Sequence, residues 1–149
     1  MNRILCFLFL MAGLACSKDE MSLGKGEYFI FGIYHGFCAS ECVTLYKLED
    51  GKLYIDAMSR LDAENLAFSE NPLPDSSYQK ALQIWEQFPA RLLTESDRIG
   101  MPDAHDQGGY FIRLNREGAT RDWYIDTVLE RLPQYLQVYI TSLNEIKLL

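Results

Sequence analysis

The side chains with the clearest chemical potential lie between positions 35 and 42. His35 is followed by Cys38 and Cys42, which are four positions apart. In an oxidising compartment such a pair usually forms a disulfide, and one turn of chain brings two Cα atoms within the roughly 4.4–6.8 Å that the bond requires. Two thiolates and an imidazole also suit Cu(I) or Zn(II). We predict a structural disulfide; a copper or zinc site, a redox-active pair and two free thiols are the alternatives.

A second group of polar side chains lies between positions 100 and 109. Asp103, His105 and Asp106 precede Gly108-Gly109. Carboxylate oxygens in a loop suit Ca²⁺, but this stretch lacks the alternating acidic residues and the distal Glu of an EF-hand. Since Pro and Asp initiate turns and glycines adopt angles that other residues resist, we interpret the stretch as a turn.

The two groups together contain the residue types of a cysteine nucleophile and its base. Cys38 or Cys42 would attack a substrate, and His105 would accept the proton. Asp103 or Asp106 would orient the imidazole. Residue type alone supports this arrangement. The sequence has no Gly-x-Ser-x-Gly elbow, phosphate-binding glycine loop or His-Glu-x-x-His motif. We therefore expect a domain without a catalytic site.

In the first half of the chain, the elements that position these groups are predicted to be strands. Residues 27–34 are rich in aromatic and β-branched residues, and two further strand-like runs cover 43–48 and 52–57. Asp50-Gly51 separates the last two runs, and this dipeptide predicts a tight hairpin. Residues 58–74 have no regular period and are predicted to form an irregular connection.

A helix is predicted from Ser76 onwards. Ser76 and Gln79 have the spacing of a capping box, and Pro89 ends the helical pattern. Its apolar residues recur at steps of three and four. They are Tyr78, Ala81, Leu82, Trp85 and Phe88.

The second half completes an α+β domain. Residues 110–114 and 123–125 alternate as half-buried strands, and 133–147 carry an apolar stripe on a second helix. The stripe consists of Leu132, Leu136, Tyr139, Ile140, Leu143 and Ile146. The order is three strands, a helix, two strands and a helix. It predicts an antiparallel sheet of about five strands with both helices packed on one face.

An aromatic surface is expected on the other face of that sheet. Phe111 and Tyr124 alternate away from the side of Ile112 and Ile125, so a sheet covered on one face alone would leave them exposed. An exposed aromatic patch usually marks a contact site, here for a protein or glycan partner. In the alternative interpretation, residues 58–74 cover this face and both rings belong to the core.

The N-terminus has the features of a lipoprotein signal peptide. Arg3 precedes the apolar run 4–15, which is shorter than the about 20 residues of a membrane-spanning helix. The run ends in Gly-Leu-Ala before Cys16, so we expect cleavage before Cys16 and its lipidation, although the lipobox Leu is displaced by one position. An ordinary signal peptide cut at the same place is the alternative. The predicted segments are a signal peptide over 1–15, a lipidated cysteine with a tether over 16–26, and one domain over 27–149.

The charge of the chain limits its partners. The formal net charge is −7, which argues against nucleic acid and against direct binding to anionic head groups. Membrane attachment is therefore expected through the lipid alone, and two or more acyl chains would make it stable. The tetrad Ser17-Lys18-Asp19-Glu20 is similar to a signal that sends lipoproteins to the outer face of the outer membrane.

The chain resembles a group of small Gram-negative lipoproteins that have no assigned activity. They combine a Lys-Asp-Glu tetrad after the lipid cysteine with a Phe-Gly-x-x-x-Gly-x-Cys-x-x-x-Cys stretch, here Phe31 to Cys42. Pro102-Asp103 and Gly108-Gly109-Tyr110 are a second shared element. The resemblance implies a lipid-anchored protein of the cell envelope. We expect a binding domain without a cofactor, and a metal-binding or redox accessory protein built on His35, Cys38 and Cys42 is the alternative.

Overall fold

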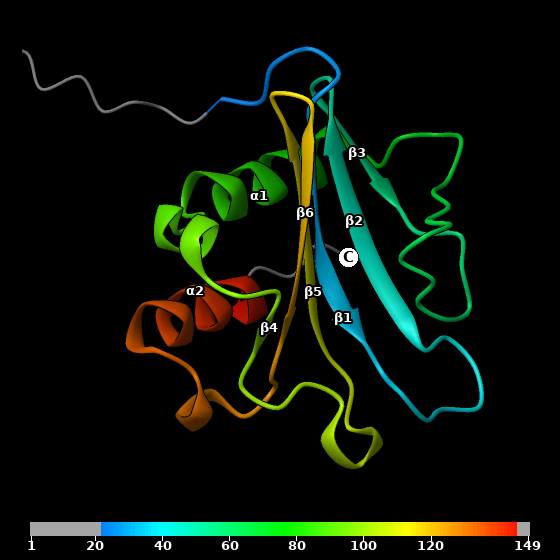
Figure 1. Cartoon of the computed structure of the whole chain (residues 1–149). Helices are drawn as coiled ribbons and strands as arrows, with labels where there is room; N and C mark the ends of the chain where they lie inside the picture. Colours follow the sequence, from blue (N-terminus) through cyan, green and yellow to red (C-terminus); the bar gives the residue numbers. More distant parts are fainter. Residues whose placement is uncertain (1–21, 146–149) are drawn as a thin grey trace, which may run out of the picture.

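The computed structural model describes residues 22–145, and these form a six-stranded sheet with two helices on one face (Figure 1). The strands are β1 (Tyr28–Tyr34), β2 (Val43–Glu49), β3 (Lys52–Ile55), β4 (Arg98–Ile99), β5 (Gly109–Arg116) and β6 (Ala119–Ile125). The helices are α1 (Asp75–Glu86) and α2 (Gln134–Glu145), with short 3₁₀ turns at Ala90–Thr94, Ala104–Asp106 and Leu129–Arg131. The predicted α+β class and the two helices on one face are confirmed.

The sheet has the strand order β3-β2-β1-β5-β6-β4. The first five strands in this order pair antiparallel with their neighbours. β4 pairs parallel with β6 through Arg98 and Ile99, which lie beside Tyr124 and Ile125. This strand is the one addition to the predicted sheet. It contains two residues, too few for an alternating pattern to appear in the sequence.

The hairpin predicted at Asp50-Gly51 joins β2 and β3. Both residues have positive φ, 47° at Asp50 and 73° at Gly51. Asp and Gly tolerate this region, and two consecutive positive φ angles match the right-handed twist of the flanking strands. Glu117 and Gly118 make the turn between β5 and β6 in the same way, with φ of 53° and 78°.

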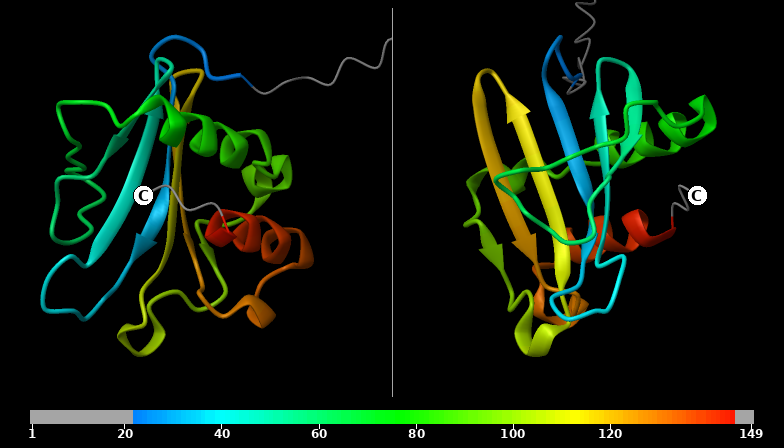
Figure 2. Two further views of the ribbon diagram at one scale, coloured as in Figure 1. Left: turned by 180° about the vertical axis from the view of Figure 1, so that it is seen from behind. Right: turned by 90° about the vertical axis from the view of Figure 1, so that its right-hand side faces the viewer.

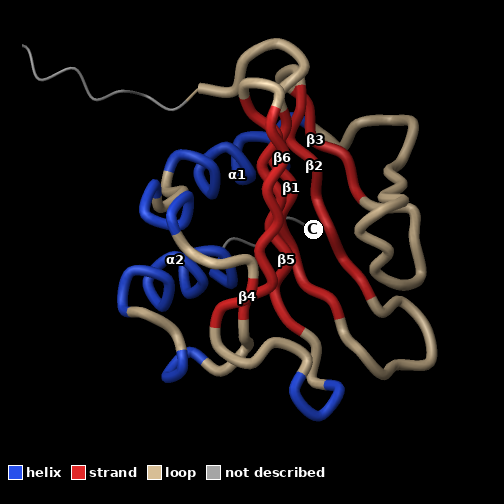
Figure 3. Tube along the Cα trace, viewed as in Figure 1, coloured by secondary structure: helices blue, strands red, loops and turns tan. Residues whose placement is uncertain are grey.

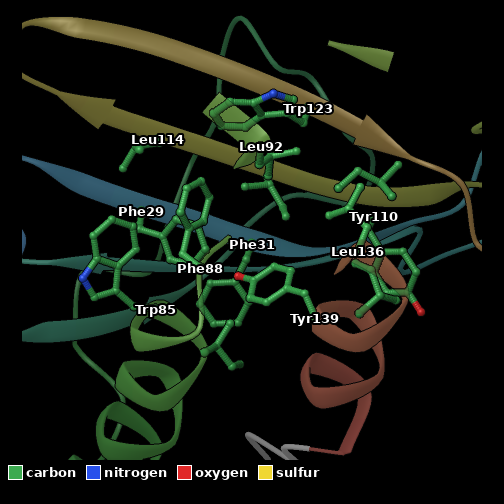
Figure 4. Packing of buried hydrophobic residues seen from close by; sticks show 14 of the residues in the cluster. Phe29, Phe31, Trp85, Phe88, Leu92, Tyr110, Leu114, Trp123, Leu136 and Tyr139 are labelled. Atoms are coloured by element: carbon green, nitrogen blue, oxygen red, sulfur yellow. The ribbon is translucent and has the colours of Figure 1, made fainter. Parts of the chain in front are cut away.

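The main core lies between the sheet and the helices (Figure 4). Trp85 of α1 is 2% exposed and Trp123 of β6 is fully buried, as the sequence pattern predicts. Phe88 joins them, with its ring centroid 5.5 Å from that of Trp85 and 6.1 Å from that of Trp123. From α2 the buried residues are Leu136, Tyr139 and Ile140, so this part of the predicted stripe faces the sheet, and Ile146 lies outside the described residues.

The predicted capping box of α1 is wrong. The helix begins at Asp75, and no side chain caps its N-terminus. Pro74 occupies the capping position in an extended conformation (ψ 151°), and its carbonyl accepts hydrogen bonds from the N–H groups of Ser77 and Tyr78. Proline suits the start of a helix because it has no N–H group to leave unpaired. The first turn therefore starts before Ser76, and that residue lies inside the helix.

The opposite face of the sheet is covered by the segment between β3 and α1 (Figures 2 and 3). Phe111 is fully buried there, in a second cluster with Ile30, Tyr34, Val43 and Leu45. The side chains that pack on this cluster from the segment are those of Met58, Leu61, Ala63, Leu66 and Phe68, and Tyr124 also packs on it. The expectation of an exposed aromatic surface at Phe111 is therefore wrong, and the alternative interpretation holds.

The covering segment is fixed by backbone hydrogen bonds and by one hydrogen bond from a side chain of the sheet. An isolated bridge joins Asp56 to Phe68, and Ala57 donates a hydrogen bond to the Ala67 carbonyl. Arg113 of β5 donates to the carbonyl of Ala63 at 2.8 Å. Apolar residues at irregular spacing thus form a second layer without a regular element. None of the helices within residues 22–145 is long and apolar enough to cross a membrane.

Candidate functional site at the loop end of the sheet

Two loops meet at one end of the sheet, and we call them together the loop end: residues 35–42 and 100–108 (Figure 1). The first loop joins β1 to β2, and the second precedes β5. Tyr34 pairs with Val43 on one side and with Gly109 on the other. Both loops therefore leave the sheet beside the end of β1, and the topology brings together the two polar groups identified in the sequence.

The loop of residues 35–42 is closed by the predicted disulfide. Cys38 and Cys42 are bonded to each other, with their Cα atoms 5.7 Å apart. His35 donates a backbone hydrogen bond to the Cys42 carbonyl at 2.8 Å, and Cys42 donates to the Ser59 carbonyl at 3.0 Å. The backbone of Cys42 thus links the first loop to the covering segment at Ser59.

The predicted alternative of a metal site has no assembled ligand set in this conformation. The disulfide uses both sulfur atoms, and the side chain of His35 is exposed. Within residues 22–145, no three side chains of His, Cys, Asp and Glu are grouped so that they could hold a metal ion. A copper or zinc site would require prior reduction of the Cys38–Cys42 bond.

The loop of residues 100–108 is a turn with unusual backbone angles. Asp103, His105 and Asp106 have φ of 60°, 58° and 60°, the left-handed region that favours glycine. Each such residue costs about 1–2 kcal/mol relative to ordinary backbone. Strained residues persist where the surrounding structure fixes them, and they concentrate at functional sites. This observation singles out the loop.

Asp126 is the residue that fixes this loop, and it is fully buried. Its carboxylate accepts hydrogen bonds from the backbone N–H groups of Met101 (2.8 Å) and Val128 (2.9 Å) and from the Gln107 amide (3.1 Å). Arg131 lies 3.4 Å away. Burial alone raises the pKa of Asp126, but the N–H groups of Val128 and Met101 and the Arg131 guanidinium outweigh it and hold the pKa below its ordinary value.

Sequence analysis missed Asp126. The sequence signal available was the position of Asp126 directly after the apolar end of a strand. A carboxylate that is buried at such a position must accept hydrogen bonds from nearby donors. Its partners Met101 and Gln107 lie about 20 or more positions away in the chain. Their approach depends on the parallel pairing of β4 with β6, which the sequence does not reveal.

The two loops contact each other closely. A Cβ atom on Gly36 would overlap the Asp103 carboxylate, and one on Gly108 would overlap the Tyr34 carbonyl and the His35 Cα. The Asp103 carboxylate accepts a hydrogen bond from the Gly108 N–H at 3.1 Å. Glycine at these positions is therefore a steric requirement of the loop end.

The predicted nucleophile, base and carboxylate are assembled only in part. Asp103 lies against the first loop at Gly36, whereas His105 and Asp106 are exposed on the second loop. Both cysteines are bonded to each other, so neither sulfur is a thiolate nucleophile in this conformation. In this conformation the predicted cysteine, His105 and the two aspartates therefore do not form a pair of groups that would transfer a proton.

Tyr34 lies beneath both loops and stays protonated at neutral pH. Burial raises the pKa of Tyr34 to about 12, and the nearby Asp103 carboxylate adds to this effect. The ring centroids of Tyr34 and Tyr124 lie 6.1 Å apart in an edge-to-face arrangement. Arg98 lies over the Tyr124 ring, with its guanidinium carbon 5.7 Å from the ring centroid. These aromatic contacts support the loops from below.

Two apolar side chains project from the loop end into solvent. Phe37 is 84% exposed on the first loop and Met101 is 59% exposed on the second. Within the part of the chain that the structure describes, Val138 on α2 is the other large apolar side chain with this degree of exposure. The exposed apolar residues whose exposure needs an explanation are therefore Phe37 and Met101, and not the predicted Phe111 and Tyr124.

Comparison with known proteins finds no family and no curated protein that matches this chain. The predicted lipidation at Cys16 and the tetrad that follows it lie outside the described residues.

Proposed function

We propose that this protein is a lipid-anchored domain of the bacterial cell envelope that binds a protein partner through Phe37 and Met101 at its loop end. The observation that carries the proposal is the combination of strain and exposure at this site. A disulfide and a buried carboxylate hold two loops that contain four non-glycine residues at positive φ and that expose the apolar side chains of Phe37 and Met101. Rigid exposed apolar residues lose little conformational entropy when they become buried in a partner.

The charges around these two residues indicate the chemistry of the partner. Glu41, Asp103 and Asp106 lie on the same two loops, and the whole chain is acidic. A complementary surface would offer an apolar pocket for Phe37 and a basic rim for the carboxylates. Phe37 would be the anchor, because a central aromatic residue typically contributes most of the binding energy.

The position of the site suits a tethered protein. The described chain begins at Ser22, at the end of the sheet that carries the turns at Asp50-Gly51 and Glu117-Gly118. Gly26 donates a hydrogen bond to Asp50, and Glu117 donates to Glu27. A lipid on Cys16 would therefore hold this end near the bilayer, and the loop end would face away from it (Figure 1).

The test places a photoreactive amino acid at position 37, and in a second variant at position 138, in the full chain in the envelope. We expect one discrete protein adduct from position 37 and none from the matched exposed position 138. With the adduct partner purified, Phe37→Ala should weaken binding by about 30-fold or more, as for an interface hot spot. Val138→Ala should leave binding unchanged.

Two results would overturn the proposal. One is the same set of adducts from positions 37 and 138. The other is a double variant, Phe37→Ala with Met101→Ala, that binds the purified partner as tightly as the unmodified chain does.

A further inference from the structure

The disulfide connects the tip of the first loop, residues 37–41, to the rest of the domain. This tip projects beyond the ends of β1 and β2 (Figure 1). Among the described residues, its backbone groups make no hydrogen bond with another backbone group. The backbone of Cys42 is in contrast hydrogen-bonded to His35 and to Ser59. The position of the tip therefore depends on the covalent link from Cys38 to the fixed Cys42.

The backbone is strained directly beside this bond. Glu41, the residue before Cys42, has φ of 53°, in the left-handed region that residues other than glycine rarely adopt. Opening of the bond would free the tip to leave this conformation. The strain at Glu41 thus favours the open form of the loop, and the bond opposes it.

Both sulfur atoms lie near a hydrogen-bond acceptor that the reduced form would use. Cys38 Sγ lies 3.3 Å from the Ser40 carbonyl oxygen, and Cys42 Sγ lies 3.3 Å from the Cys38 carbonyl oxygen. A disulfide whose reduced form is stabilised is reduced more readily. A thiol is only a weak donor, however, so these contacts hold the tip less firmly than the covalent bond does.

The bond is open to a reductant from the side of Cys38. Cys42 is 2% exposed, whereas Cys38 is half-buried and its neighbours Phe37 and Ala39 are exposed. Thiol–disulfide exchange requires attack by a thiolate on one of the two sulfur atoms, and access influences which one is attacked. A reductant would therefore attack Cys38 Sγ, and Cys42 Sγ would be the leaving group.

We infer that the Cys38–Cys42 bond is a reversible redox switch that controls binding through Phe37. This inference rests on the proposed function and adds its regulation. The reductant is a protein dithiol. One of its thiolates attacks Cys38 Sγ, the Cys38–Cys42 bond breaks, and Cys42 leaves as a thiolate that takes up a proton. The second thiolate of the reductant then displaces Cys38, which also takes up a proton, and the reductant becomes a disulfide.

Reduction would release the tip and leave the domain folded. The bond closes a loop of few residues, so its loss changes the stability of the whole domain little. Phe37 is 84% exposed and adjacent to Cys38, so it would lose its fixed position and would have to be ordered again on binding. The oxidised form would therefore bind the partner, and the reduced form would bind it more weakly.

The first measurement tests whether the bond is easily reduced. The full chain, purified from cells, is equilibrated with an excess of thioredoxin that is half reduced and half oxidised. Alkylation of Cys38 and Cys42 is then followed by peptide mass spectrometry. We expect more than half of the molecules to be reduced, since structural disulfides resist reduction and regulatory ones do not. A reduced fraction below one half would overturn the inference.

The second measurement follows the side chain at position 37. A fluorinated phenylalanine at this position reports the mobility of the tip by fluorine NMR, and the same label at position 111, which is fully buried, is the matched control. We expect reduction to shift and narrow the signal from position 37 and to leave the signal from position 111 unchanged. An unchanged signal from position 37 would overturn the inference. So would a shift of the signal from position 111 to its value in the unfolded protein.

The third measurement links the switch to binding, through the photoreactive residue at position 37. In envelopes treated with reduced thioredoxin, the yield of the protein adduct should be about tenfold lower or less than in envelopes treated with oxidised thioredoxin, because the partner must then order the tip. A variant with Cys38→Ser and Cys42→Ser is the matched control and should give the same low yield after both treatments. A difference between the treatments in this variant would trace the effect to the partner and overturn the inference.

The adduct yields also distinguish failure of this inference from failure of the proposed function. The absence of a discrete adduct in both redox states would overturn the proposed function, and the inference with it. Equal yields of one discrete adduct in the two states would overturn the inference alone.

Discussion

At the residue scale, a few side chains hold the loop end in a conformation that the backbone resists. Asp126 accepts hydrogen bonds from donors in two segments, the loop of residues 100–108 and the chain after β6, and its burial is compatible with a charge only because these donors are present. The strain at Asp103, His105 and Asp106 is therefore offset by contacts that lie outside the loop. Loss of Asp126 should affect this site more than loss of any single loop residue.

Replacement of Asp126 by Ala should destabilise the domain by about 3 kcal/mol, because the N–H groups of Met101 and Val128 would remain buried without acceptors. The measurement is unfolding in urea followed by tryptophan fluorescence. Asp97→Ala is the matched control, since the Asp97 side chain is exposed, and it should change the free energy of unfolding by less than about 0.5 kcal/mol. Equal effects of the two variants would contradict the role given to Asp126.

The lowered pKa of Asp126 predicts the direction of a pH effect. A carboxyl whose pKa is lower in the folded state stabilises that state above its unfolded pKa, about 3.9, and loses this contribution as the pH falls through the folded value. The free energy of unfolding should therefore decrease below about pH 4. An Asp126→Asn variant should show a shallower decrease over the same range, measured by urea titration at several pH values. The same pH dependence of the free energy of unfolding in both proteins would contradict the assignment of this effect to Asp126.

The strain at His105 can be tested with glycine. His105 has φ 58° and an exposed side chain, so His105→Gly removes a steric cost and should stabilise the domain by up to about 1 kcal/mol. His35 is also exposed but lies outside the positive-φ region, so His35→Gly should be neutral or destabilising. Thermal unfolding of the two variants side by side gives the comparison. Destabilisation by both would mean that the His105 backbone is not strained.

At the scale of elements, the sequence predicts most of the structure where the apolar period is regular. The alternation around Ile112 and Trp123, the helical spacing around Trp85 and the Asp50-Gly51 turn each identify an element that the structure contains. Period and turn chemistry are local properties, so a single sequence reveals them. The two-residue strand β4 has no period of its own and could not be predicted in this way.

The covering layer over Phe111 shows why the candidate site could be predicted only in part. Met58, Leu61, Leu66 and Phe68 are apolar, but their spacing matches neither a helix nor a strand. An irregular segment takes its conformation from the surface it covers, here fixed by the Asp56–Phe68 bridge and by Arg113. The cysteine pair was predictable because its chemistry depends on spacing within one short loop.

The Cys38–Cys42 bond should contribute only modest stability, because it closes a very short loop. Loop-closure entropy for so few residues gives about 2 kcal/mol or less. A double Cys38→Ser, Cys42→Ser variant should therefore stay folded, with the core around Trp85 and Trp123 intact by near-ultraviolet circular dichroism. Its binding through Phe37 should weaken, since that residue directly precedes Cys38 and its position depends on the loop that the bond closes. A variant that unfolds at ambient temperature would show that the bond has a larger structural role.

At the scale of the whole molecule, the proposed function gives the two ends of the described chain different roles. Leu23, Glu27 and the turns at Asp50-Gly51 and Glu117-Gly118 lie at the end where the described chain begins, and hydrogen bonds fix the start of the chain there. The loop end lies at the other end of β1, whose seven residues span roughly 20 Å. A protein anchored at one end and binding at the other must hold a defined orientation relative to the membrane, and this orientation can be measured.

The anchor and the orientation are tested together by fluorescence quenching. Ala119→Cys and Met101→Cys place one labelling site at the tether end and one at the loop end, both at exposed positions. With the lipidated full chain in vesicles that contain head-group spin labels, a fluorophore at position 119 should be quenched more strongly than one at 101, because nitroxide quenching falls steeply over the roughly 20 Å between the two ends. Cys16→Ala should release the protein from the vesicles and remove quenching at both sites. Equal quenching at 119 and 101 would mean that the domain lies flat on the bilayer, and membrane retention of Cys16→Ala would mean that the attachment does not depend on this cysteine.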